Sequence, residues 1–179
     1  MTDMDRTQIQ VSLAEQRLWL LAPQGVLREW PISSARNGAG ERSGSECTPR
    51  GWHGIVARIG EGCAPGTVFV GRRPTGETYR AELGREHPGR DWILTRILWL
   101  RGLQPGYNRL GQVDSMRRYV YIHGCPDEYP MGVPLSHGCI RMRNRDVMEL
   151  FDRVTTGTLV WIEEGRLEKP AWREFPEAR

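Results

Sequence analysis

Short apolar segments separated by turn-forming residues run through most of this chain of 179 residues. Ile9, Val11 and Leu13 alternate with polar residues, which is the period of a half-buried strand, and a second apolar stretch at 18–21 completes a predicted hairpin. The other strand candidates are 26–32, 55–59, 67–70, 92–100, 119–123 and 158–162. Seven or eight short strands indicate a mainly β fold, either a sandwich or a barrel.

One helix is well marked, over about Arg145 to Val154. Asn144 is placed to cap it, and Asp146 lies in the first turn, where the helix dipole favours an anion. The apolar residues follow the i, i+3, i+4, i+7 spacing of one buried face, at Val147, Leu150, Phe151 and Val154. The sequence therefore predicts a single amphipathic helix that leads into the last strand.

Two long segments rich in turn formers interrupt the strands, at Ser33–Arg50 and Gly102–Asp114. Loops of this length are often functional, and the second is predicted to form a wall of a substrate cleft. The length of the chain indicates one domain over 1–179, with a core at about 8–164 and a loosely attached tail at 165–179.

Charge and hydropathy exclude several classes of function. The formal net charge of +3 is small and evenly spread, so no nucleic-acid partner is expected. No apolar run reaches the ~18 residues that a membrane span needs, so no membrane partner is expected either. The first thirty residues lack the features of a secretory signal, which predicts a cytoplasmic location, or a periplasmic one if a signal lies upstream. In a reducing compartment the four cysteines would be free thiols, metal ligands or a nucleophile.

The tripeptide His-Gly-Cys occurs twice, at His123-Gly124-Cys125 and at His137-Gly138-Cys139. Three interpretations are open. Buried thiols and satisfied histidines explain each residue singly but not their clustering. A tetrahedral zinc site would use both histidines and both cysteines, although a spacing of one residue within each pair is atypical of such sites. A cysteine nucleophile served by a histidine base is the third.

The nucleophile interpretation needs only Cys139 and a nearby base. His123 ends a predicted strand, with its side chain on the same face as Tyr119 and Tyr121, and the following loop can return Cys139 to that strand end. A neighbouring histidine can raise the thiolate fraction of the cysteine by accepting its proton.

Residues next to the cysteine suit the same chemistry. Gly138 allows the backbone to turn and to leave successive N–H groups free for an oxyanion. Arg141, two residues after Cys139, would share its face in an extended chain, and its guanidinium could bind the carboxylate of a peptide C-terminus.

These residues resemble the L,D-transpeptidase (YkuD-type) catalytic domain. The similarity extends from about Gln8 to Ile162, and its most specific part is the run Ser136-His137-Gly138-Cys139-Ile140-Arg141-Met142 with the upstream Ile122-His123-Gly124. It is supported by Thr48-Pro49-Arg50-Gly51, Gly132, Asn144, Asp146, Leu150 and the return strand at 157–160.

The resemblance implies a YkuD-like β-sandwich or barrel, with Cys139 as nucleophile and His123 as base, oriented by a backbone carbonyl. Ser136, His137, Gly138 and Arg141 would then bind substrate or the oxyanion. No cofactor and no metal are implied. A carbapenem would act as a covalent inhibitor at Cys139.

The implied substrate is a murein tetrapeptide or muropeptide, cleaved between meso-diaminopimelate and D-alanine through a thioester. Hydrolysis by a cytosolic L,D-carboxypeptidase that recycles muropeptides is favoured, and L,D-transpeptidation with 3-3 cross-linking or D-amino-acid exchange is the alternative. Cys125 departs from the family, which commonly has threonine or serine after His-Gly, so its role stays open.

Overall fold

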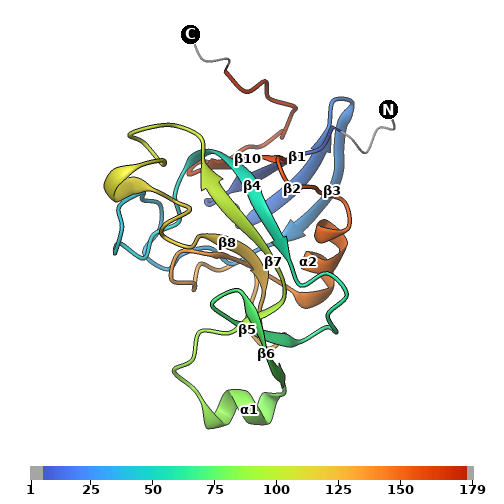
Figure 1. Cartoon of the computed structure of the whole chain (residues 1–179). Helices are drawn as coiled ribbons and strands as arrows, with labels where there is room; N and C mark the ends of the chain where they lie inside the picture. Colours follow the sequence, from blue (N-terminus) through green and yellow to red (C-terminus); the bar gives the residue numbers. More distant parts are fainter. Residues whose placement is uncertain (1–5, 177–179) are drawn as a thin grey trace.

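The computed structural model describes residues 6–176 and is mainly β (Figure 1). Its strands are β1 (Gln8–Ser12), β2 (Arg17–Ala22), β3 (Gly25–Pro31), β4 (Gly51–Ile59), β5 (Thr67–Val70), β6 (Arg73–Thr78), β7 (Ile93–Gly102), β8 (Tyr121–Gly124), β9 (Ile140–Met142) and β10 (Leu159–Glu163). The two α-helices are α1 (Ala81–Glu86) and α2 (Asn144–Phe151), and a 3-10 turn, η2, spans Gly111–Val113.

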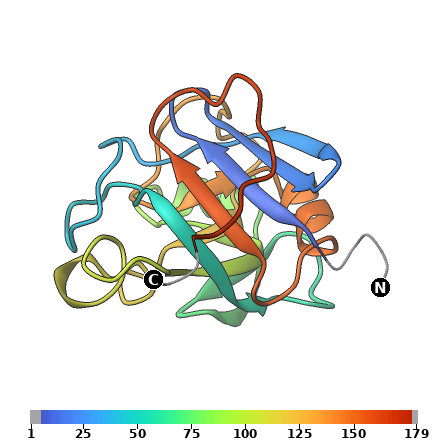
Figure 2. The same ribbon diagram turned by 90° about the horizontal axis from the view of Figure 1, so that it is seen from above.

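The strands form one hydrogen-bonded sheet in the order β3-β2-β1-β10-β4-β7-β5-β6. β8 pairs with β7 as well, and β9 continues from β8. β1, β10 and β4 lie side by side in the view from above (Figure 2), where β1 and β10 run parallel and β4 runs antiparallel to β10. β5, β6 and α1 extend from one end of this body (Figure 1).

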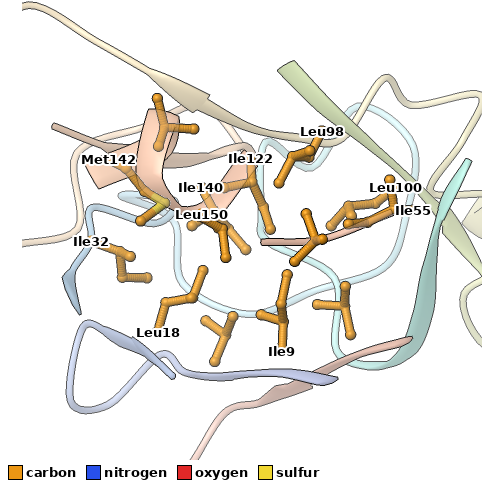
Figure 3. Packing of buried hydrophobic residues seen from close by; sticks show 14 of the residues in the cluster. Ile9, Leu18, Ile32, Ile55, Leu98, Leu100, Ile122, Ile140, Met142 and Leu150 are labelled. Atoms are coloured by element: carbon orange, nitrogen blue, oxygen red, sulfur yellow. The ribbon is translucent and has the colours of Figure 1, made fainter. Parts of the chain in front are cut away.

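The main core lies where the sheet folds over itself. Its largest apolar cluster takes side chains from the β1–β2 hairpin on one side and from β7 and β8 on the other, and Figure 3 shows Ile9 and Leu18 facing Leu98 and Ile122 across it. All four side chains have 0% exposure. Full burial of one large apolar side chain stabilises a folded protein by about 1.5–3 kcal/mol. Because this cluster holds most of the buried apolar side chains, it is the principal source of stability.

The strand pattern predicted the fold well. The 8–22 hairpin is confirmed, and each other predicted strand corresponds to an observed one with ends shifted by no more than a few residues. Two strands were not predicted: the side chains of β6 are almost all exposed, and β9 has only three residues, so neither carries a readable apolar period. The short α1 buries no residue and was missed for the same reason.

The predicted helix is present as α2, but its start is different from the prediction. Val147, Leu150 and Phe151 are buried on one face as expected. Asn144 is the first helical residue and not the cap, because Arg143 occupies the capping position without a side-chain hydrogen bond. The amide of Asn144 instead donates to the carbonyl of Cys125 at 2.9 Å, which ties the helix to the end of β8.

The C-terminal segment, predicted to be loosely attached, makes defined contacts with the sheet. Within the described part, 165–176, it crosses the outer face of β1, β10 and β4 (Figure 2). Gln8 both donates to the carbonyl of Arg173 at 2.7 Å and accepts from its N–H at 3.1 Å, and Ser12 donates to the carbonyl of Gly165 at 2.8 Å. The ring of Phe175 packs edge-on against Trp52. Residues 177–179 of the predicted tail lie outside the described residues.

Within residues 6–176, no helix has the length and apolar character needed to cross a membrane.

Candidate active site

Two neighbouring parallel strands place the predicted base and nucleophile on one face. β8 and β9 pair so that His123 lies beside Arg141. Cys139 precedes β9 by one residue and, being two residues before Arg141, shares its face. The N–H of Tyr121 donates to Cys139 Sγ at 3.3 Å, and Sγ is 3.4 Å from the carbonyl oxygen of Tyr119.

The sequence alternation explains this arrangement. Ile122 pairs with Ile140, and both are completely buried in the main core. Their chain neighbours His123 and Arg141 must therefore point to the opposite face of the two strands. Tyr121, two residues before His123 in β8, shares this face as predicted. Tyr119 has a φ of 56° and lies outside β8, but its ring packs beside Trp99, as the ring of Tyr121 does.

His123 is buried, with 1% exposure, and its ring is oriented by the backbone. Nδ1 is 2.6 Å from the carbonyl oxygen of Gly124, which can only accept, so Nδ1 carries the proton and Nε2 carries the free lone pair. Burial lowers the pKa of His123, against the opposing effect of the Asp91 carboxylate. The imidazole is therefore neutral at pH 7 and able to accept a proton.

Gly138 forms the turn that presents Cys139. Its φ of 129° is a conformation that other residues rarely adopt, and its carbonyl accepts a hydrogen bond from Thr48 Oγ1 at 2.9 Å. Ser136 Oγ accepts the N–H of Gly138 at 3.2 Å and donates to the carbonyl of Cys139 at 2.5 Å. The prediction of successive free N–H groups is thus corrected at Gly138, whose N–H is already engaged.

Cys139 is only partly exposed and packs beside Ile97 and Tyr121. Burial raises the pKa of its thiol to about 12, and the hydrogen bond from the Tyr121 N–H opposes this shift. Cys139 therefore rests as a thiol, which would need a base to become reactive at neutral pH.

Arg118 places a positive charge behind the turn at Ser136–Cys139, here called the nucleophile turn after the predicted role of Cys139. Its guanidinium donates to the carbonyls of Gly40 at 3.1 Å, Glu41 at 2.9 Å and Cys47 at 2.6 Å. Partial burial lowers the pKa of Arg118, and its positive charge acts to lower the pKa of Cys139. This side chain holds the 40–47 loop close to Gly138. A Cβ atom added at Gly138 would lie 4.0 Å from Nη2 of Arg118.

Arg141 faces the site as predicted, but its guanidinium already has partners. Nη2 forms an ion pair with Asp91 at 2.9 Å, and Nη1 donates to the carbonyl of Leu135 at 3.3 Å. The guanidinium also lies over the ring of Tyr129, 5.3 Å from its centroid. Arg141 is 6% exposed, so its guanidinium is held in place by these partners and is not free to bind a ligand carboxylate.

A cavity of about 430 Å³ opens beside the nucleophile turn. It is lined by His137 and Arg141, which flank Cys139 in the chain, and by residues of three further segments, among them Arg36, Arg90, Asp91 and Tyr129. His137 is exposed at this cavity. The predicted wall, Gly102–Asp114, is not part of it, since Gln104 and Tyr107 line a different cavity with Arg50 and Glu164.

Cys125, the cysteine of the first His-Gly-Cys tripeptide, is buried and has no access to solvent. Cys125 has 0% exposure, its Sγ is 3.4 Å from the carbonyl oxygen of Met142, and burial raises its pKa to about 12. All four cysteines are free thiols. Across residues 6–176, no three histidine, cysteine or acidic side chains gather as metal ligands would, so nothing in the described structure favours the zinc interpretation.

The family model of the L,D-transpeptidase catalytic domain, YkuD, matches residues 6–162. This chain belongs to the YkuD family. The match includes β1 through β10 apart from the last residue of β10, and with them the whole site just described.

Relatives with similar sequences carry the same family name. The chain is 33% identical over 168 residues to a protein of Escherichia coli (strain K12) named Probable L,D-transpeptidase ErfK/SrfK. The match covers 89% of this chain and 45% of that protein, so the chain spans less than half of the relative's length.

Solved L,D-transpeptidases share the YkuD fold at low sequence identity. L,D-transpeptidase 3 from Mycobacterium tuberculosis, in complex with a faropenem-derived adduct, gives a TM-score of 0.54 at 16% identity, with 88% of this chain and 60% of that chain covered. LD transpeptidase LdtMt1 in complex with imipenem gives 0.52 at 19% identity, with 87% and 58% covered.

Three residues of this YkuD site were missed from sequence. Asp91 lies 50 positions before Arg141, and Arg36 and Arg118 look like ordinary surface arginines in a chain that has 25 basic residues. Thr48, in contrast, could be recognised from sequence because it begins the Thr-Pro-x-Gly turn, and its hydroxyl contacts the carbonyl of Gly138.

Proposed function

We propose that this protein is a cysteine-dependent L,D-carboxypeptidase that removes D-alanine from murein tetrapeptides. The observation that carries the proposal is the register of β8 and β9, which sets a neutral histidine base and a partly exposed thiol on one face beside a cavity. Membership of the YkuD family supports acyl transfer through a thioester.

The proposed reaction follows from the protonation states of the site. His123 Nε2 takes the proton of Cys139 as Sγ attacks the carbonyl carbon on the L-centre of meso-diaminopimelate. The C–N bond to D-alanine then breaks, and the leaving amine receives the proton from His123. Water, deprotonated by the same imidazole, attacks the thioester and releases the tripeptide acid and the thiol.

The oxyanion of each tetrahedral intermediate needs fixed N–H donors. We assign this role first to the N–H of Cys139, for which no hydrogen-bond partner is found within the described chain. Ser136 and Gly138 fix the turn that aims it, through the contacts of Ser136 Oγ to both neighbours. His137, exposed at the cavity, is proposed to contact the substrate peptide.

Hydrolysis is proposed over transfer because Cys139 is partly exposed and its neighbours His137 and Arg141 line a cavity, so that water can reach a thioester at this position. L,D-transpeptidation is the second candidate, and the name of the Escherichia coli relative favours it. Incubation with a disaccharide-tetrapeptide separates the two by product mass. Tripeptide supports hydrolysis, whereas dimers or D-amino-acid exchange support transfer, and the absence of all three products would refute both.

Substitution of the two central residues tests the mechanism. Cys139→Ala is expected to abolish turnover, and His123→Ala to lower kcat by about 100-fold or more, since each group supplies a separate catalytic effect. Cys125→Ala is the matched control, because that thiol is buried away from solvent and should leave kcat nearly unchanged. Full activity of Cys139→Ala would exclude the mechanism.

A carbapenem is proposed to acylate Cys139. Support comes from the structural relative in complex with imipenem. Intact-protein mass spectrometry should show one imipenem adduct on the wild type and on Cys125→Ala, and none on Cys139→Ala. An adduct that persists in Cys139→Ala would place the reactive thiol elsewhere.

A cytoplasmic role in muropeptide recycling is part of the proposal. Osmotic-shock fractionation, with mass spectrometry of the N-terminus, tests it. Full-length protein retained with the cytoplasmic fraction supports the role, and a processed form released with the periplasm would contradict it.

A further inference from the structure

The cavity beside Cys139 contains three guanidinium groups, and two of them are already neutralised. Arg90 forms a two-bond ion pair with Glu77, at 3.2 and 2.8 Å, and lies over the ring of Trp92. Arg141 is paired with Asp91 at 2.9 Å. Each is thus held by a carboxylate of the protein itself, and neither is free to bind a ligand anion without giving up that partner.

Arg36 is the third cation, and its side chain is exposed. Within residues 6–176 its guanidinium has no ion pair and no hydrogen bond. Its backbone is nevertheless fixed, because its N–H donates to the carbonyl of Ser136 at 3.0 Å and Ala35 bridges to Ser136. Ser136 in turn donates to the carbonyl of Cys139, so Arg36 is anchored to the turn that carries the nucleophile.

We infer that Arg36 binds a carboxylate of the peptide substrate in this cavity, while the Arg141–Asp91 pair shapes the wall. This inference rests on the proposed function. A substrate carboxylate could bind Arg141 only by displacing Asp91, because Arg141 is 6% exposed and its guanidinium is already held by Asp91 and by the carbonyl of Leu135. Binding to Arg36 breaks no existing pair, and a guanidinium can hold a carboxylate through two parallel hydrogen bonds.

A murein tetrapeptide offers this chemistry at two places near the scissile bond. One is the terminal carboxylate of D-alanine, and the other is the carboxylate on the side chain of diaminopimelate. Three substrates distinguish them: the free tetrapeptide, its D-alanine amide, and its diaminopimelate side-chain amide. The amide that the wild type discriminates against identifies the carboxylate that is bound.

Arg36→Gln is the test variant and Arg42→Gln the matched control. Arg42 is an exposed arginine of the same loop that lines no part of the cavity. Loss of a charge-assisted pair should raise KM for the free tetrapeptide about 10- to 100-fold in Arg36→Gln, with kcat changed much less. On one of the two amides Arg36→Gln should equal the wild type, and Arg42→Gln should match the wild type on all three substrates.

An equal rise in KM for the free tetrapeptide and for both amides in Arg36→Gln would overturn the inference, and so would an unchanged KM for the free tetrapeptide.

If the wild type turns over none of the substrates, the proposed function fails. The role of Arg36 is then tested by a measurement that needs no turnover. Cys139 is alkylated by iodoacetate, which carries a carboxylate, and by iodoacetamide, which is neutral. The ratio of the two rates measures how strongly the site attracts a carboxylate. This ratio should fall about threefold or more in Arg36→Gln at low salt and remain unchanged in Arg42→Gln. A ratio unaffected by Arg36→Gln would overturn the inference.

Discussion

Cys139 and His123 are both held in their neutral forms by their surroundings. Burial raises the pKa of the thiol to about 12 and lowers that of the imidazole. In the proposed reaction a proton must therefore move from sulfur to nitrogen, because both groups start in their neutral forms at pH 7. The fixed charges nearby, on Arg118, Arg141 and Asp91, set how difficult that transfer is.

The pH dependence of alkylation tests this protonation state. Because the folded pKa of Cys139 lies far above neutrality, the thiolate fraction should rise about tenfold for each pH unit between pH 7 and pH 9. The rate of iodoacetamide labelling should follow without a plateau. A plateau below pH 8 would reveal a stabilised thiolate and contradict the resting state described above.

Arg118 should assist the thiolate by its charge. Arg118→Gln removes a cation whose effect is to lower the pKa of Cys139, so labelling should be about threefold slower at each pH. The neighbouring Arg117 is exposed, and Arg117→Gln serves as the control. Equal rates in the two variants would show that Arg118 only holds the 40–47 loop.

At the scale of secondary-structure elements, the first residue of α2 joins three segments. The Asn144 amide donates to the carbonyl of Cys125 at 2.9 Å and to Asp127 at 3.1 Å, and its Oδ1 accepts from Thr95 at 2.5 Å. Thr95 has a φ of 72° at the point where the pairing of β7 with β8 shifts register. This junction fixes the end of β8, next to His123.

Asn144→Ala should therefore destabilise the protein by about 1–3 kcal/mol, because buried hydrogen-bonding groups lose their partner. Arg145→Ala is the control, since the Arg145 side chain is 85% exposed. Urea unfolding followed by tryptophan fluorescence measures both changes. Similar free energies of unfolding for the two variants would argue against the junction.

At the scale of the whole molecule, we expect a second buried histidine to lower the stability of the protein in acid. His53 of β4 has 0% exposure, with Nδ1 at 3.1 Å from the carbonyl of Gly51 and Nε2 at 2.8 Å from Ser115 Oγ. Burial lowers its pKa from 6.5 to about 4. Below pH 6.5 the unfolded chain thus binds more protons than the folded one, and stability falls as the pH falls towards 4.

The loss of unfolding free energy from His53 should be about 2 kcal/mol between pH 7 and pH 5. His123 acts in the same direction, because burial lowers its pKa too. His53→Gln should reduce this pH dependence, whereas His87→Gln, at an exposed position, should retain it. An undiminished pH dependence in His53→Gln would assign the acid sensitivity to other groups.

The C-terminal segment should contribute to global stability. Deletion from Gly165 onwards removes its hydrogen bonds to Gln8, Gln10 and Ser12, and uncovers Trp52. After the ordering entropy of the segment is set against these contacts, a loss on the order of 2 kcal/mol is expected. Arg166→Ala, at an exposed residue, is the control for thermal unfolding. An unchanged Tm in the deletion would support the loose attachment predicted from sequence.

The local pattern of the sequence determined the mainly β fold, the amphipathic face of α2 and the candidates Cys139 and His123. These features depend on side-chain period and on a contiguous motif, both of which lie within a few neighbouring residues. The tertiary structure decided the partners: Asp91 for Arg141, the 40–47 loop for Arg118, and the Ser136 turn for Arg36. These pairs are separated by 50 to 100 residues, and only the pairing of strands and the packing of loops brings them together. Thus the sequence alone predicted the reactive group, and the fold decided which charges surround it and which arginine of the cavity has no partner among the described residues.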